Sequence, residues 1–259
     1  MNSATPVHIA SILRYPVKGL RGEALDKVKL TAGRTLPFDR AWAIENGPSG
    51  FDPASPGFLP KTKFLALVRD ERLALLDIRF DEAAKMLVIL RGGKPVVSGK
   101  LDEPTGRQVL EQFFASFMEA DLRGPPKILA GPGHSFSDVP DKCVSIINRA
   151  SCDDLARVVG RAIDPDRFRG NFVLEGLAPW AEFDWVGRRI RLGSAQVEVF
   201  ARIQRCPATN VDPRTAARDM QIPKSLMDAF GHMDCGVYAR VIEDGKAEPG
   251  SPVKSIQAN

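Results

Sequence analysis

The stretch QVEVFARIQRCPATNVDP, residues 196–213, joins an apolar strand to a turn that carries a thiol. Val197, Val199 and Ile203 alternate with other residues over 196–203, which predicts a β-strand with one buried face. Cys206 follows that strand directly beside Arg205. A single cysteine is more often a small buried hydrophobe, but a neighbouring cation favours the thiolate, the form that binds metals. Cys206 is therefore the first candidate for chemistry.

The other cysteines lie in different surroundings. Cys143 lies in a strand-like alternation, Cys152 opens a helical stretch, and Cys235 precedes the last predicted strand. The four cysteines form no CxxC pair, which indicates reduced thiols. The N-terminus has neither a basic region nor an apolar segment of a signal peptide, and no apolar run approaches the roughly 20 residues that cross a bilayer. We therefore expect a cytoplasmic protein without a membrane partner.

Composition limits the class of protein further. The 259 residues are 44% hydrophobic and 26% charged, as in an ordinary soluble globular chain. The formal net charge of +4 comes without a Lys/Arg-rich run, so we expect no nucleic-acid partner. Arginines concentrated in the second half could form a solvated basic face or one concave anion site. They are Arg167, Arg169, Arg188, Arg189, Arg191, Arg202 and Arg205.

The first half reads as short strands with turns between them. Strands are predicted at 8–15, 24–30 and 41–45, with a hairpin formed by 73–80 and 85–90. Residues 46–60 are rich in Pro and Gly and predict a long loop that either binds a ligand or is mobile. A helix is predicted over 105–120, where apolar residues recur at helical spacing. Gly124-Pro125-Pro126 then breaks the pattern, so we divide the chain into domains at 1–123 and 124–259.

The second half continues with strands and two short helices. Strands are predicted at 127–130, 143–147, 171–175, 184–192, 196–203 and 237–243. One helix is predicted from Ser151, with Ser151 and Asp154 as a capping box, and another over 224–230. Neither a βαβ alternation nor a GxGxxG motif is apparent, which argues against a Rossmann domain. The sequence predicts a mostly β protein with a few helices.

Five motifs gain meaning from their order. They are YPVKG at 15–19, DRAW at 39–42, RFRGN at 167–171, and RCPATNVDP at 205–213 followed by GVYARV at 236–241. Taken singly, Lys18 reads as a solvated loop lysine and Arg40 as an ion-pair partner of Asp39. Together they resemble the MOSC proteins that begin with a MOSC N-terminal β-barrel domain, as in the amidoxime-reducing components. The resemblance runs from about residue 8 to 253 and implies a two-part β-barrel architecture with a molybdenum-molybdopterin cofactor between the parts.

The resemblance also implies roles for individual residues. Cys206 matches the thiolate that ligates molybdenum, and a soft sulfur ligand suits that metal. Lys18, Arg40 and Arg169 match contacts to the cofactor phosphate and pterin, so we expect these three to converge on one anion site. The further implied cofactor contacts are Gly19, Asn148, Arg149, Asn171 and Arg205.

The chain departs from the family pattern in three places. Gly19 replaces a serine common in relatives, and Ala216 replaces the glycine of a DPxTG ending, which predicts a different turn there. The C-terminal ferredoxin domain of some bacterial relatives is missing, so we expect electrons from a separate electron-transfer protein or reductase. Asp212 is either a turn former or a group that supports the metal ligand. His232, Asp234 and Cys235 are interpreted as a structural turn rather than a zinc site.

Two functions remain open, and a third is disfavoured. The first is a molybdenum-dependent oxidoreductase that removes oxygen from small N-hydroxylated substrates such as amidoximes, hydroxylamines and N-hydroxylated base analogues. The second is a module that binds or carries the cofactor, or handles its sulfur, without reductase activity. Nucleic-acid binding by the small barrels is disfavoured because few surface aromatics are expected.

Overall fold

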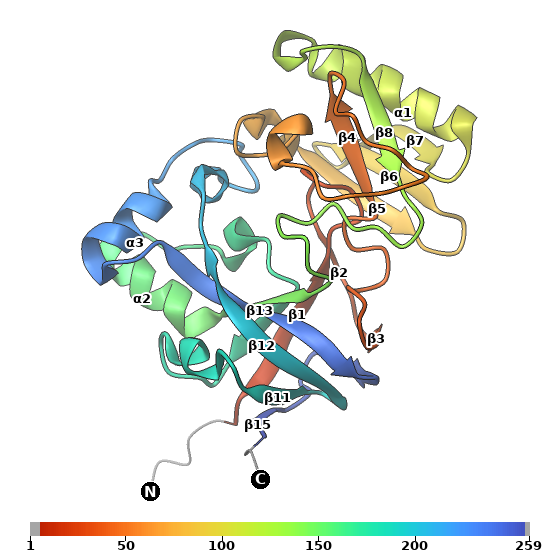
Figure 1. Ribbon diagram of the computed structural model, residues 1–259. Coiled ribbons are helices and arrows are strands. Elements are labelled where there is room, and N and C mark those ends of the chain that lie inside the picture. The colour runs from red at the N-terminus through yellow and green to blue at the C-terminus, as the bar shows by residue number, and fades with distance from the viewer. Residues whose placement is uncertain (1–5, 257–259) are drawn as a thin grey trace, which may run out of the picture.

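The computed structural model describes residues 6–256 and is built around an eight-stranded sheet (Figure 1). The strand order is β15-β11-β12-β13-β9-β10-β1-β2. Two strands of the first half therefore extend a sheet made otherwise by the second half. The strands are β1 (His8–Arg14), β2 (Glu23–Ala24), β9 (Val144–Asn148), β10 (Phe172–Glu175), β11 (Arg189–Leu192), β12 (Ala195–Gln204), β13 (Asp234–Glu243) and β15 (Val253–Ser255).

Smaller sheets surround this one and confirm a mostly β fold. One of them forms a three-stranded meander, and helix α1 packs beside it on β7 and β8 (Figure 1). Two other pairs, β3 with β14 and β4 with β8, join segments far apart in the sequence. The elements are β3 (Val28–Leu30), β4 (Trp42–Asn46), β5 (Leu76–Asp81), β6 (Met86–Arg91), β7 (Lys94–Lys100), α1 (Pro104–Phe117), β8 (Pro126–Ala130) and β14 (Gly245–Ala247).

Local periodicity accounts for the first-half core. Leu76, Ile78 and Phe80 alternate with exposed or half-buried residues along β5, so one face of the hairpin is apolar. That face meets Leu110 and Phe114 of α1 in one buried cluster. The predicted hairpin and the helix over 105–120 are thereby confirmed, with α1 spanning Pro104–Phe117. Strand β7 was missed because most of its side chains are exposed and give no apolar alternation.

The large sheet is covered on one side by two helices. Helices α2 (Arg149–Val159) and α3 (Ile222–Phe230) contribute Leu155 and Leu226 to a buried cluster. Cys152 and Cys235 belong to the same cluster and are fully buried. Burial and mutual contact therefore give these two thiols a packing role, as their sequence surroundings indicated.

Three details differ from the sequence predictions. Strands β9 and β10 pair in parallel through α2, so the chain does contain one βαβ unit. Two short apolar runs cannot show their mutual direction, which explains the error. Helix α2 is capped by Asn148 rather than Ser151, because the Asn148 side chain accepts a hydrogen bond from the backbone N–H of Ala150. The start of the predicted strand 184–192 lies in a 3-10 helix, Ala181–Trp185.

Among residues 6–256, no helix is both long and apolar enough to cross a bilayer. The loop predicted at 46–60 has no strand or helix after Asn46, the last residue of β4, and is anchored internally. Ser49 donates its hydroxyl to the buried Glu45 carboxylate, and Phe51 packs against Phe136 with ring centroids 4.9 Å apart.

Candidate cofactor site

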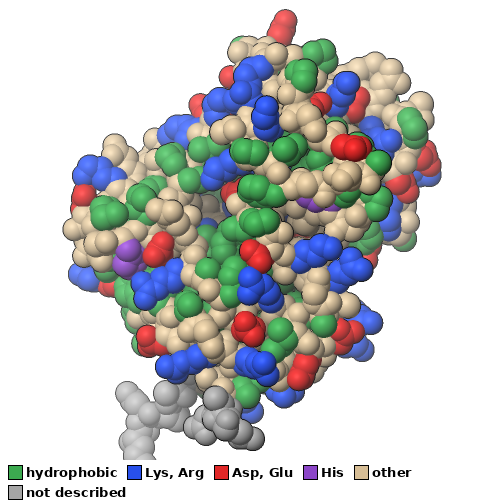
Figure 2. Space-filling view, in the orientation of Figure 1, with side chains coloured by type: hydrophobic (Ala, Val, Ile, Leu, Met, Phe, Trp, Pro, Cys, Tyr) green, Lys and Arg blue, Asp and Glu red, His purple; other side chains and the backbone are tan. Residues whose placement is uncertain are grey.

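A cavity of about 410 Å³ lies where the two halves of the chain meet. Figure 2 shows this face of the molecule hollowed near its centre. The lining comes from turns that follow or precede strands, and these turns are far apart in the sequence. Of the predicted site residues, the cavity is lined by Lys18, Gly19, Arg40, Arg169, Asn171, Arg205 and Cys206.

Lys18 enters the cavity from the turn after β1. Its backbone N–H donates to the Trp42 carbonyl at 2.8 Å, and its Nζ donates to the Phe136 carbonyl at 2.8 Å and to Asp138 Oδ1 at 2.5 Å. Burial lowers the pKa of Lys18, although the Asp138 carboxylate works against that shift. The next residue, Gly19, has φ +87° and a Cβ there would lie 2.6 Å from the Leu65 carbonyl oxygen. Only glycine fits this turn, which explains the absence of a side chain there.

Arg40 and Arg169 flank one aromatic ring. Their guanidinium carbons lie 4.7 and 4.4 Å from the ring centroid of Tyr15, which is fully buried. Arg40 donates to the Arg169 carbonyl at 2.9 Å and to the Asp39 carboxylate. Both arginines have φ +53°, a conformation that costs non-glycine residues about 1–3 kcal/mol. The tertiary structure holds two cations close together in spite of that cost.

Arg169 lacks a neutralising partner. Its guanidinium makes no hydrogen bond or ion pair with the described residues, in contrast to Arg40. The pKa of Arg169 is lowered to about 10, mainly by burial; Tyr15 opposes this shift and the nearby charge of Arg40 adds to it. An anion bound in the cavity would offset the repulsion between these two close cations. A phosphate suits this role because it can accept two parallel hydrogen bonds from the planar guanidinium of an arginine.

The thiol of Cys206 has a cation beside it, but that cation is Lys61. Lys61 Nζ lies 3.2 Å from Cys206 Sγ and 3.6 Å from Asp138 Oδ2. Burial lowers the pKa of Lys61, but the charges of Asp138 and Cys206 outweigh it and the net pKa is raised. Arg205 instead donates to the carbonyls of Cys235 at 2.7 Å and Phe168 at 2.9 Å. The sequence expectation that Arg205 faces the thiol is therefore wrong.

Asp138 connects the two lysines of the cavity. Its carboxylate bonds Lys18 through one oxygen and lies near Lys61 through the other. Burial alone would raise the pKa of Asp138, but Lys18 and Lys61 hold it well below its usual range. The two lysines therefore favour an anionic oxygen at this position.

Asn171 lines the cavity but uses both ends of its side-chain amide in bonds to neighbouring strands. Its Oδ1 accepts from the N–H and hydroxyl of Ser145 at 3.0 and 2.9 Å, and its Nδ2 donates to the Leu13 carbonyl at 3.2 Å. These bonds tie β1, β9 and β10 together beneath the cations. The side chain of Asn171 positions the cavity wall.

Asn148 and Arg149 do not line this cavity. The Asn148 amide donates to the Ala178 carbonyl and to Glu182 Oε2, both at 2.8 Å, while its oxygen caps α2. Arg149 forms an ion pair with Glu175 at 2.6 Å. The structure thus gives Asn148 structural partners, which the resemblance alone did not indicate.

We expect Asn148→Ala to destabilise the fold by about 1–3 kcal/mol, because it removes a helix cap and two hydrogen bonds, one of them to the buried Glu182 carboxylate. Phosphate binding in the cavity should stay unchanged. Urea unfolding and phosphate titration calorimetry measure the two effects. Asn148→Ser, which keeps a capping oxygen, should recover part of the stability. Unchanged stability with lost phosphate binding would instead place Asn148 at the cofactor.

Two turns singled out in the sequence are structural as well. Asp212 Oδ1 accepts from the N–H groups of Arg214 and Thr215 at 2.9 and 2.8 Å, and its Oδ2 pairs with Arg167 at 3.0 Å. Ala216 closes this turn with φ +60°. The alanine therefore occupies the left-handed conformation that favours glycine, rather than changing it.

The His232 turn packs against aromatic rings. Its Nδ1 accepts from the Asp234 N–H at 3.1 Å, and its ring lies edge-on to Phe183 and Trp180. Phe183 and Trp185 are buried in the core. Among residues 6–256, no three His, Cys, Asp or Glu side chains gather to hold a metal ion.

Comparisons with known families support the resemblance that the motifs indicated. The MOSC N-terminal beta barrel domain matches residues 7–123, and the MOSC domain matches residues 131–254. The chain belongs to the proteins that combine these two domains. The domain limits drawn from the sequence, 1–123 and 124–259, stay a prediction, because β1 and β2 pair within the large sheet.

The relatives are named for the molybdenum cofactor or for amidoxime reduction. A molybdenum cofactor sulfurase of Caenorhabditis briggsae is 31% identical over 96% of this chain, which spans 35% of that protein. Mitochondrial amidoxime-reducing component 1 of Mus musculus is 27% identical over 33% of this chain and 24% of its own length. The crystal structure of YiiM from Geobacillus stearothermophilus is 25% identical, with a TM-score of 0.35 over 44% of this chain and 54% of that one. The family is thereby linked to the molybdenum cofactor.

Proposed function

We propose that this protein binds a molybdenum-molybdopterin cofactor in the 410 Å³ cavity and reduces N-hydroxylated compounds there. One observation carries the proposal: Lys18, Arg40 and Arg169 line the same cavity as the thiol of Cys206. A phosphorylated cofactor that also carries a soft metal needs this combination of cations and sulfur.

The residues present fit such a group. The guanidinium of Arg169, which has no hydrogen bond or ion pair among the described residues, offers a planar set of donors to a phosphate, and the charge of Arg40 lies close to it. Lys18 already holds an anionic oxygen, that of Asp138. Cys206 would hold the metal through Sγ, and Lys61 at 3.2 Å would stabilise negative charge on that sulfur.

The reaction consumes two electrons and two protons, converting N–OH into N–H and water. The cofactor supplies the electron-transfer chemistry when it is bound. The chain contributes binding, charge and proton storage, with Lys61 Nζ the protonated group beside Sγ. We further propose a separate electron-transfer protein or reductase as the electron source, and the cytoplasm as the compartment.

A cofactor-carrying or sulfur-transfer module is the second candidate. The sulfurases among the relatives favour it, together with the half-buried position of Cys206, the one cysteine among the described residues that is not buried. In this role Cys206 would retain the cofactor or carry a persulfide. Lys61 beside Sγ would stabilise the negative charge of the Cys206 thiolate or persulfide in this role as well.

Turnover of benzamidoxime separates the candidates. Holoprotein with reduced methyl viologen should form benzamidine, measured by chromatography. A holoprotein with a full complement of molybdenum that forms no benzamidine would support the sulfur-transfer role instead if, in a separate incubation without viologen, its Cys206 thiolate takes the outer sulfur atom of glutathione persulfide, releases glutathione and gains the mass of one sulfur atom. Holoprotein that shows neither result would leave the carrier role.

Lys61→Met should slow alkylation of Cys206 by iodoacetamide about fivefold at neutral pH. A partly exposed charge pair contributes about 1 kcal/mol, and its loss disfavours the reactive thiolate. Peptide mass spectrometry measures the rate at Cys206 alone. Lys63→Met is the matched control, since Lys63 is exposed in the same 3-10 turn, Lys61–Lys63, and lacks an ion pair with the described residues. Equal rates in both variants would remove Lys61 from the chemistry.

A further inference from the structure

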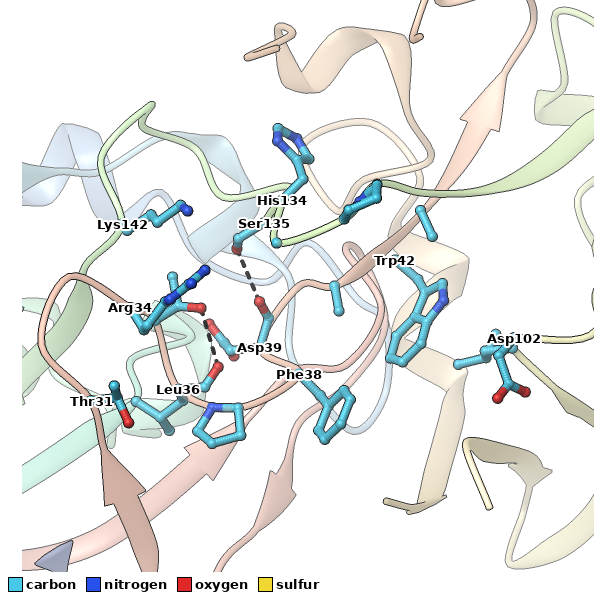
Figure 3. Close-up of a pocket in the computed structure, with 18 of the residues that line it drawn as sticks. Thr31, Arg34, Leu36, Phe38, Asp39, Trp42, Asp102, His134, Ser135 and Lys142 are labelled. Atoms are coloured by element: carbon cyan, nitrogen blue, oxygen red, sulfur yellow. Dashed lines mark hydrogen bonds between the residues drawn. The ribbon is translucent and has the colours of Figure 1, made fainter. Parts of the chain in front are cut away.

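A second and larger cavity, of about 740 Å³ (Figure 3), shares Asp39 with the proposed cofactor cavity. Its walls come from residues 29–42, the start of α1, and the loop 130–135, with Lys142 at one end. Such a volume lies within the range of pockets that hold small organic ligands. The proposed reductase chemistry uses none of this cavity.

One end of the cavity is cationic. Figure 3 shows Arg34 and Lys142 on the same side, with His134 near them. Neither the Arg34 nor the Lys142 side chain has a hydrogen bond or ion pair to the described residues, and both are exposed. Burial, and then the charge of Lys142, lower the pKa of His134. The charges of Arg34 and Lys142 are therefore available to an anion from solvent.

The other end of the cavity is aromatic. Phe38 and Trp42 line it with their rings stacked at a centroid distance of 6.0 Å, and Figure 3 shows them opposite Arg34 and Lys142. The acidic residues of the lining do not cancel the cationic end. Asp102 lies beyond Trp42 in the view, and the Asp39 carboxylate is taken up by the Tyr15 N–H and by Arg40.

The two cavities share one wall. Asp39 lines both, and its neighbours Phe38 and Arg40 face one cavity each with positive φ angles of 61° and 53°. The loop on the other side of the wall is bonded to it: the Ser135 hydroxyl donates to the Asp39 carbonyl at 2.9 Å, and the Phe136 N–H to the Arg40 carbonyl at 2.7 Å. A ligand in the larger cavity would therefore touch the backbone that carries Arg40.

We infer that the larger cavity is a second ligand site, which takes a compact aromatic anion such as an aromatic carboxylate or sulfonate. The anionic group lies between Arg34 and Lys142, and the ring packs toward Phe38 and Trp42. Charge complementarity and an aromatic surface at opposite ends select this class over neutral aromatics and over inorganic anions.

Isothermal titration calorimetry with 1-naphthalenesulfonate tests this site directly. The protein should bind this probe at least about tenfold more tightly than neutral 1-naphthalenemethanol, because charge-assisted hydrogen bonds contribute about 1.5–3 kcal/mol each. The double variant Arg34→Ala/Lys142→Ala should lose about tenfold or more in affinity for the sulfonate, with little change for the alcohol.

Arg79→Ala/Lys94→Ala is the matched control. It removes the same two charges from exposed positions of the first half that line neither cavity, and it should bind the sulfonate like the parent protein. If both double variants lose the same affinity for the sulfonate, the loss comes from the change in net charge alone, and the proposed site is wrong. Loss of binding in Lys18→Ala, with none in Arg34→Ala/Lys142→Ala, would place the probe in the cofactor cavity and overturn it as well, as would no measurable binding to the parent protein.

Discussion

Cys206→Ala should abolish reduction of N-hydroxylated substrates while the protein stays folded. The thiol is half-buried just after β12 and belongs to no core cluster of the described residues, so its loss costs little stability. Because Cys206 is the proposed protein ligand of molybdenum, its removal should lower turnover by more than the roughly 10- to 100-fold expected for a residue that only supports a ligand. Cys206→Ser should be nearly as inactive, because a hydroxyl is a harder and much less acidic donor. Circular dichroism, molybdenum content and benzamidoxime turnover measure the three quantities.

The structure supplies a control within the same cavity. Cys143 also lines it, but burial raises the pKa of this thiol to about 12, so it stays protonated. Cys143→Ala should keep most of the turnover. Cys152→Ala and Cys235→Ala should lower stability more than turnover, because both thiols lie in the α2–α3 core. Full molybdenum content and parent-like turnover in Cys206→Ala would show that another group anchors the metal.

Asp138→Asn should change anion binding and stability in opposite directions. The cofactor-free variant should bind inorganic phosphate about tenfold more tightly, because the carboxylate no longer neutralises Lys18 and Lys61. Its free energy of unfolding should fall by about 1 kcal/mol, since the half-exposed carboxylate gives up its pair with a buried lysine. Phosphate titration calorimetry and urea unfolding, both without cofactor, measure the two changes.

Asp141→Asn is the matched control for this variant. Asp141 lies three residues along the same loop and pairs with Arg240 outside the cavity lining, so phosphate affinity should not change. The lysines hold the pKa of Asp138 below its usual range, so its stabilising contribution is present at neutral pH. That contribution begins to fall when the pH drops below the ordinary pKa of a carboxyl group, and it is lost once the pH has passed through the lowered pKa of the folded state. Unchanged phosphate affinity in Asp138→Asn would show that anions bind elsewhere.

The sequence by itself determined the elements that carry their own periodicity. The β5–β6 hairpin, helix α1 and strand β12 follow from apolar spacing that local backbone geometry requires. The sequence also placed a thiol directly after β12, and supplied three motif cations that line one cavity. These features depend on residue type and neighbours along the chain, which sequence reasoning can read.

The tertiary structure decided which group faces which. Arg205 precedes the thiol, but its guanidinium turns to the Cys235 and Phe168 carbonyls, and Lys61 takes the place beside Sγ. Asp138 likewise reaches Lys18 across 120 residues of sequence. No local pattern records such contacts, because they depend on strand pairing between distant segments and on which buried polar groups need partners. The parallel pairing of β9 and β10 could not be predicted for the same reason. A short apolar run predicts that a strand is buried, but it does not predict which strand it pairs with or in which direction.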